Sequence, residues 1–132
     1  MPKDLLPQRK PVMKVPATPQ NVNTFGDIFG GWLMGQVDIA GGILAIERSG
    51  GRVATRAVSN FQFLKPVKVG DLVLCYGEVI RVGRTSITVD MEVYVERRRP
   101  PEYHAEVHKV ADASIVYVAL DPDGKARPVA PA

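Results

Sequence analysis

One stretch of the chain, from Ile28 to Ile46, carries a single ionisable side chain, that of Asp38. Its apolar residues fall on every side of a helix drawn over about 29–48, which is typical of a helix buried all round. Gly50 follows the stretch and favours a helix end. A membrane span is disfavoured, because five glycines interrupt the apolar surface and a charge at the bilayer centre costs about 2.5–3.5 kcal/mol. We therefore predict a long helix enclosed by protein.

Strand patterns follow the helix. Over residues 86–96 apolar side chains alternate with polar ones, which predicts a strand with Ile87 and Val95 facing the core and Tyr94 facing outward. The other predicted strands are 11–15, 52–64, 72–82 and 103–120. A single helix on one antiparallel sheet is an α+β architecture. The helix is buried all round if the sheet curls about it, or if a partner subunit covers its other side.

The length of 132 residues fits one domain, which we expect at residues 11–128 after a flexible tail at 1–10. The net charge of +3 suits a small polyanionic ligand at least as well as nucleic acid. A nucleic-acid-binding surface usually shows a basic stripe with stacking aromatic residues, and the sequence has no such stripe. The dense run from Arg97 to Arg99, next to Pro100 and Pro101, is expected to be a solvated loop.

Cys75 is the only cysteine and lies in an apolar run, so it is interpreted as a core thiol. A single cysteine permits a reducing compartment, and no signal peptide is seen at the start of the sequence. We therefore expect a cytoplasmic protein with no membrane partner. His104 and His108 have no metal-ligand spacing with other residues, and they are interpreted as solvent-facing strand residues without a metal or cofactor.

Several common catalytic signatures are missing, including the serine-hydrolase elbow, the P-loop, the dinucleotide-binding loop and the zincin helix. The segment that can carry chemistry is the start of the predicted helix. Gly30 and Gly31 offer backbone N–H groups at the positive end of the helix dipole, which can hold a developing oxyanion. Asp38 lies eight residues on, about 12 Å along the axis. The alternatives are that Asp38 caps nearby backbone or pairs with a cation, and that the glycines serve close packing.

The segment from Asn23 to Gly42 resembles the signature of the YciA-like acyl-CoA thioesterases, which are short hot-dog enzymes. Its pattern is N-x-x-G-D-I-F-G-G-W followed by an aspartate in the helix. Three later segments, 63–71, 82–86 and 118–125, also resemble that family in order and spacing. The resemblance covers about residues 12–128. Phe25 departs from it, since related sequences often carry a smaller residue there, and the shape of the acyl pocket is affected accordingly.

The resemblance implies an α+β hot-dog fold and hydrolysis of acyl-CoA to a free acid and CoA. It places the catalytic aspartate at Asp38 and the loop asparagine at Asn23. It places the CoA-binding turn at four residues, Gly83, Arg84, Thr85 and Ser86. An ordinary hairpin with glycine at a positive φ is the other interpretation of that turn. The family also implies dimers with two sheets joined side by side, often as a trimer of dimers.

Spacing predicts that the site is shared between subunits. Asn23 precedes the helix and Asp38 lies two turns inside it, so Asn23 of one subunit is expected to meet Asp38 of the other. Asp38 then acts as general base on water or attacks the thioester directly. A hydratase on the same fold and a non-catalytic acyl-CoA-binding module are the alternatives. Hydratases of this kind use a histidine with the acid, and neither histidine lies near the helix in the sequence.

Overall fold

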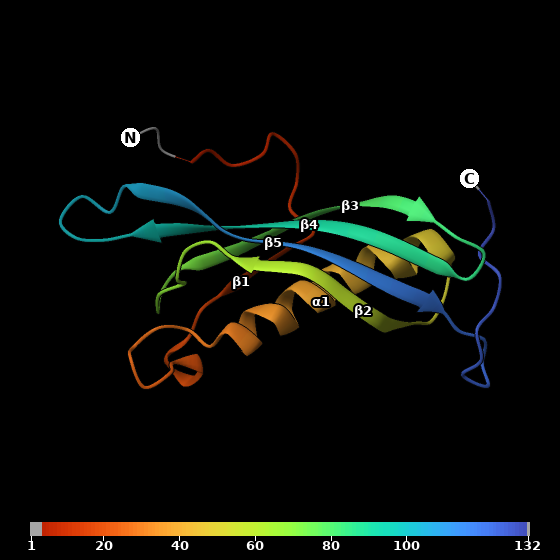
Figure 1. The fold of residues 1–132 in the computed structure, drawn as a ribbon. Coiled ribbons are helices and arrows are strands. Elements are labelled where there is room, and N and C mark those ends of the chain that lie inside the picture. The colour runs from red at the N-terminus through yellow and green to blue at the C-terminus, as the bar shows by residue number, and fades with distance from the viewer. Residues whose placement is uncertain (1–3, 132) are drawn as a thin grey trace.

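The computed structural model describes residues 4–131 and has one long helix lying across a five-stranded antiparallel sheet (Figure 1). The sheet curves around the helix, which confirms the predicted α+β hot-dog architecture. A short 3-10 turn, η1, precedes the helix. The elements are β1 (Met13–Pro16), η1 (Pro19–Asn21), α1 (Gly30–Ser49), β2 (Val53–Phe63), β3 (Leu72–Val82), β4 (Ser86–Arg98) and β5 (Ala105–Ala119).

The strand order is β1-β3-β4-β5-β2, with every neighbouring pair antiparallel. Residues 83–85 join β3 to β4 and residues 99–104 join β4 to β5, while β2 crosses to the far edge and pairs with β5. β1 pairs only with Leu72–Cys75 of β3. The two edge strands of the sheet are therefore β1 and β2, and the second half of β3, beyond the end of β1, is also unpaired on that side.

The main core lies between α1 and the inner face of the sheet. In β4 the alternating residues Ile87, Val89, Met91, Val93 and Val95 are all buried, as the alternation predicts. From α1 the buried side chains include Leu33 and Val37. Cys75 is fully buried, and burial raises the pKa of its thiol to about 12, which confirms a core thiol.

The outer face of the sheet carries a second, smaller cluster. Tyr94, predicted to face outward, does so but is only 8% exposed, because it packs with Leu74 and Tyr76. Leu6 from the N-terminal stretch covers this cluster. The alternation of apolar and polar residues in β4 predicts the face on which Tyr94 lies, but it cannot predict that a segment distant in the sequence covers that face.

Part of the expected tail lies along the outer face of the sheet, while residues 1–3 lie outside the described residues. Asp4 accepts a hydrogen bond from the backbone N–H of Lys109 at 2.7 Å. Arg9 donates to the carbonyl of Gly77 at 3.0 Å and stacks over the ring of Tyr76. Residues 4–9 therefore connect to three strands of the sheet through polar and apolar contacts.

The basic run was predicted to be a solvated loop, and that prediction is wrong for its first two residues. β4 continues to Arg98, and the guanidinium of Arg97 donates two hydrogen bonds of 2.8 Å to the buried carboxylate of Asp71. Asp71 is 1% exposed, and burying a carboxylate is costly unless it is paired and hydrogen-bonded, as it is here with Arg97. The two residues are far apart in the sequence, and for that reason the local pattern could not reveal the pair.

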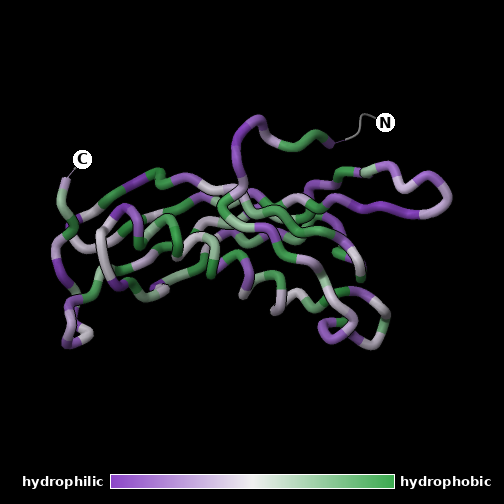
Figure 2. The backbone as a smooth tube through the Cα atoms, turned by 180° about the vertical axis from the view of Figure 1, so that it is seen from behind, coloured by the Kyte–Doolittle hydropathy of each residue, from purple (hydrophilic) through white to green (hydrophobic). Residues whose placement is uncertain are grey.

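One side of α1 is not covered by its own chain. Ile39, Ile43 and Ile46 are 55%, 37% and 48% exposed, and Phe29 at the start of the helix is 51% exposed. The hairpin between β4 and β5, by contrast, is strongly hydrophilic (Figure 2). The prediction of a helix buried all round therefore holds within one chain for the sheet side only. Of the helices in residues 4–131, none is long and apolar enough to span a bilayer.

Candidate active site

The carboxylate of Asp38 lies half-buried on α1, between the helix and the strands β2 and β5. Its Oδ1 accepts a hydrogen bond of 2.6 Å from the hydroxyl of Thr55 and lies 3.1 Å from the hydroxyl of Tyr117. Within residues 4–131, Asp38 forms no ion pair and its Oδ2 receives no hydrogen bond. Neither structural alternative, a cation pair or a backbone cap, describes this carboxylate. Oδ1 is held by two neutral hydroxyl groups, and Oδ2 is available to react with a substrate or a water molecule.

Tyr117 fixes Asp38 from the core side. Its hydroxyl is also 2.7 Å from the backbone carbonyl of Asp38, and the side chain is only 1% exposed. Burial, followed by the charge of Asp38, raises the pKa of Tyr117, so the hydroxyl keeps its proton and donates. Gly41 makes this contact possible, because a Cβ there would overlap Oη of Tyr117 and lie 3.2 Å from its ring. Gly41, three residues after Asp38, therefore has to be small so that Tyr117 can pack against the helix.

Thr55 and Tyr117 were missed by the sequence analysis. Tyr117 is one of several buried residues that alternate along β5, and Thr55 is one polar residue in an exposed edge strand. Neither residue stands in a motif that indicates catalysis. Only the packing of α1 on the sheet brings both hydroxyls to Asp38.

Asn23 lies in the loop before α1, where its side chain organises its own turn. Its Oδ1 accepts from the backbone N–H groups of Phe25 at 2.8 Å and of Asp27 at 3.1 Å. Asp27 in turn forms an ion pair with Lys68, which ties the loop to the turn before β3. The oxygen of the Asn23 amide is therefore used locally, and its NH₂ group remains as a donor.

The start of α1 has free backbone donors. Phe29 is the N-cap residue and supplies no side-chain cap, so the N–H groups of Gly30 and Gly31 lack intrahelical acceptors. A mainly apolar pocket of about 320 Å³ opens beside them, and it is lined by Ile28, Phe29, Gly30, Leu33 and residues 63–67. Phe25 is not among the lining residues and is 89% exposed at the tip of the loop. Such a pocket can hold an alkyl chain next to polarising N–H groups.

One protomer does not assemble all the predicted residues. Asp38 lies about 12 Å along α1 from Gly30, and Asn23 lies beyond the helix start. Within residues 4–131 the hydrogen bonds of Asn23 stay inside its loop, while those of Asp38 go to β2 and β5. The structure therefore places these residues in two separate groups, one at the start of α1 with Asn23 in the preceding loop, and one around Asp38 further along the helix.

The turn from Gly83 to Ser86 lies at the other end of α1, beside its C-terminus (Figure 1). The N–H of Gly83 donates to the carbonyl of Ser86 at 2.8 Å, and Arg84 and Thr85 accept backbone hydrogen bonds from the C-terminal part of the chain. Gly83 does not have a positive φ. Glycine is needed there for space, because a Cβ would lie 2.6 Å from the hydroxyl of Ser86.

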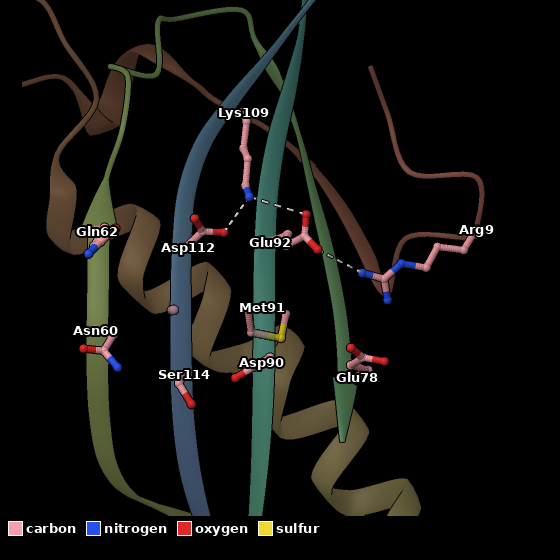
Figure 3. Close-up of a pocket in the computed structure, with 11 residues that line it drawn as sticks. Arg9, Asn60, Gln62, Glu78, Asp90, Met91, Glu92, Lys109, Asp112 and Ser114 are labelled. Atoms are coloured by element: carbon pink, nitrogen blue, oxygen red, sulfur yellow. Dashed lines mark ion pairs between the residues drawn. The ribbon is translucent and has the colours of Figure 1, made fainter. Parts of the chain in front are cut away.

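A further cavity, of about 360 Å³, lies on the outer face of the sheet (Figure 3). It contains none of the predicted site residues. Lys109 pairs there with Asp112 at 2.9 Å and with Glu92 at 3.6 Å, and Arg9 pairs with Glu92. Both cations of this cavity are therefore engaged by carboxylates, which is typical of a surface ion-pair network.

No cluster of metal-ligating side chains occurs in the part of the chain that the structure describes. His104 is exposed in the hairpin before β5, not in a strand as predicted, and His108 lies in β5. His108 is 3.4 Å from Glu106 on the same strand. Because nine residues separate His108 from Tyr117 along β5, this imidazole is about 30 Å from the region of Asp38.

Comparisons with known proteins agree with this fold. Residues 25–102 match the family model of the thioesterase superfamily. The acyl-CoA thioester hydrolase YciA of Salmonella typhimurium is 47% identical over 126 residues, covering 96% of this chain and 94% of that protein. A hexameric hotdog fold thioesterase of Campylobacter jejuni is 38% identical with a TM-score of 0.88, covering 92% of this chain and 91% of its own.

A third relative is the acyl-CoA hydrolase of Staphylococcus aureus, solved in complex with butyryl coenzyme A and coenzyme A. It is 28% identical with a TM-score of 0.78, covering 89% of this chain and 69% of its own. Variants with an asparagine or a threonine changed to alanine have been solved, and those two residues are as far apart in its sequence as Asn23 and Thr55 are here. The chain belongs to the thioesterase superfamily and, within it, to the YciA-type acyl-CoA thioester hydrolases.

Proposed function

We propose that the domain at residues 11–128 hydrolyses acyl-CoA to a free carboxylic acid and CoA. The observation that carries this proposal is the setting of Asp38, whose Oδ1 is held by Thr55 and Tyr117 while its Oδ2 has no partner among the described residues. A carboxylate held this way can accept a proton or attack a carbonyl carbon. The kinship with YciA and with the S. aureus hydrolase supports acyl-CoA as the substrate.

The site is proposed to be shared across a two-fold axis. A thioester carbonyl cannot contact Gly30 and Asp38 of one protomer together, because about 12 Å of helix separates them. A partner helix running antiparallel brings its own start next to Asp38. The exposed isoleucines on the free side of α1 are the surface such a helix would cover. Asn23 and Gly30 of one protomer then face Asp38 of the other.

The residues suggest a two-step reaction. As a water oxygen attacks the thioester carbon, Oδ2 of Asp38 takes its proton, and the N–H groups of Gly30 and Gly31 receive the oxyanion. When the tetrahedral centre collapses, the carbon–sulfur bond breaks and the thiolate leaves with that proton. The NH₂ group of Asn23 orients the water or the carbonyl. Direct attack by Asp38, with a mixed anhydride that water then opens, uses the same arrangement.

Thiol release from a panel of acyl-CoA substrates tests the proposal directly. We expect turnover with at least part of the panel, and the panel also reports which acyl chains the pocket at Gly30 accepts. A hydratase is disfavoured, because His108 lies about 30 Å along β5 from Tyr117. A folded protein that binds acyl-CoA without releasing thiol would instead indicate a non-catalytic binding module.

The turn from Gly83 to Ser86 is proposed to bind the CoA nucleotide, with Arg84 as its cation. We expect Arg84→Ala to raise KM for acyl-CoA with little change in kcat, because the same contact exists in ground and transition states. The expected loss of binding free energy is about 1.5–3 kcal/mol for one charge-assisted contact. Steady-state kinetics measures this, and a fall in kcat at constant KM would contradict the assignment.

The protein is expected to be at least a dimer, and a hexamer built as a trimer of dimers is the specific proposal. The exposed apolar side of α1 and the unpaired edge of β2 are surfaces that an assembly would cover. The relative from C. jejuni is hexameric. Light scattering at micromolar concentration should give a mass of two to six times the 14.4 kDa of the chain. A mass of one chain would exclude a shared site.

A further inference from the structure

A cavity of about 620 Å³ lies where the C-terminal end of α1 meets the turn after β3. Arg48 from the last turn of α1, Arg81 near the end of β3 and Arg84 in the turn all line it, and its lining includes no carboxylate. Three cationic side chains from three local structures therefore converge on one cavity. Such a site attracts anions with more than one negative charge.

The charges of these arginines are not neutralised within the described chain. Arg9, Arg97 and Arg98 each form an ion pair. By contrast, Arg48, Arg81 and Arg84 have no ion pair and no side-chain hydrogen bond to any residue in 4–131.

Arg48 is exceptional among them. Its Nη2 is buried and has no hydrogen-bond partner among the described residues. Leaving a buried guanidinium N–H without an acceptor is costly, so a site that retains one is expected to receive an acceptor from outside the chain.

The backbone explains why a cavity forms there. β1 pairs only with the first half of β3, so Val79–Val82 run along an uncovered edge. The pairing of β3 with β4 shifts by one residue between Val79 and Arg81, which leaves Ile80 as the extra residue of a bulge. Bulges re-aim neighbouring side chains. Val82, Val129 and Pro131 add an apolar wall that suits a flat ring.

We propose that Arg48, together with Arg81 and Arg84, forms a binding site for the phosphate groups of a nucleotide, and that Arg48 is its buried anchor. The inference rests on the proposed function and identifies the nucleotide as that of the CoA substrate. Arg48 lies ten residues beyond Asp38, about 15 Å along α1. The extended arm that joins the thioester to the phosphates of CoA fits that separation. Planar guanidinium groups are suited to phosphate oxygens.

Two substrates that differ only in the nucleotide test the role of Arg48. We expect Arg48→Gln to raise KM for an acyl-CoA about tenfold or more, with kcat unchanged. KM for the same acyl group on pantetheine, which lacks the nucleotide, should not change. Arg98→Gln is the matched control, because Arg98 is exposed, lies in β4 and pairs with Glu96. It should leave both KM values unchanged.

A binding measurement separates this inference from the proposed hydrolysis. Calorimetry with adenosine 3′,5′-bisphosphate should show binding to the wild-type protein and about tenfold weaker binding to Arg48→Gln, even if no thioester is hydrolysed. Arg48 could instead serve only the helix C-terminus, where a cation is favourable. A lower melting temperature with unchanged KM and bisphosphate affinity would show that role and overturn the proposal. Equal KM increases for both substrates, or no bisphosphate binding by the wild type, would also overturn it.

Discussion

Asp38→Asn should lower kcat by about 10²–10⁴-fold, the usual scale for loss of a general base. The amide keeps the shape of the carboxylate, and its oxygen can still accept from Thr55 and Tyr117. The position of Oδ2, which has no partner among the described residues, then holds a group that cannot take a proton from water. CoA affinity should survive, because the turn at Gly83–Ser86 lies at the far end of α1.

Thermal melting on the same preparation separates catalysis from stability. We expect the melting temperature of Asp38→Asn to stay the same or rise, because a half-buried charge is replaced by a neutral amide. Asp90→Asn is the matched control, since Asp90 lies on the outer face of β4 beside the cavity of paired charges. The control should keep normal turnover. A well-folded Asp38→Asn protein with near-normal turnover would show that another residue supplies the catalytic carboxylate.

Gly41→Ala should both destabilise the protein and reduce kcat. The new methyl group would overlap the hydroxyl of Tyr117, which is buried in the core and cannot simply swing into solvent. We expect a loss of about 1–3 kcal/mol in the free energy of unfolding, as for other overpacked cores. As the ring is displaced, Asp38 loses the hydroxyl that orients it, and kcat should fall about tenfold, the scale of one hydrogen bond.

The adjacent glycine provides the control for this substitution. A Cβ at Gly42 would meet the same tyrosine ring at 3.7 Å, an ordinary van der Waals distance. Gly42→Ala should therefore keep activity, and it could stabilise the helix by up to about 1 kcal/mol. Tyr117→Phe isolates the hydroxyl and should reproduce the fall in kcat without steric overlap. If Gly41→Ala retained the wild-type melting temperature and kcat, the contact between Tyr117 and the helix would be unimportant.

Local periodicity was sufficient to predict most of the fold. The helix predicted at about 29–48 is observed at Gly30–Ser49, and the strand predicted at 72–82 is observed at Leu72–Val82. Such elements follow from the spacing of apolar residues, which can be read directly from the sequence. The strands predicted at 11–15 and 103–120 differ from the observed ones at their ends, where the pairing partner decides how far a strand runs.

Asp38 also stood out in the sequence, because an isolated acid in an apolar helix is costly without a partner or a function. Which groups surround it could not be predicted. Thr55 and Tyr117 are 17 and 79 residues away in the chain, and no motif connects them to the helix. The pairing of Arg97 with Asp71 and the burial of Tyr94 were missed for the same reason.

The sequence by itself therefore determined the order of the elements, the long helix and the position of the lone carboxylate, because these depend on residues near one another in the chain. Only the tertiary structure decided which oxygen of Asp38 is held, why Gly41 must be small, and that Arg48 lines one cavity with Gly83 and Arg84. The physical reason is that hydrogen bonds, ion pairs and steric limits act between atoms a few ångströms apart. Folding alone sets those distances for residues that are far apart in the sequence.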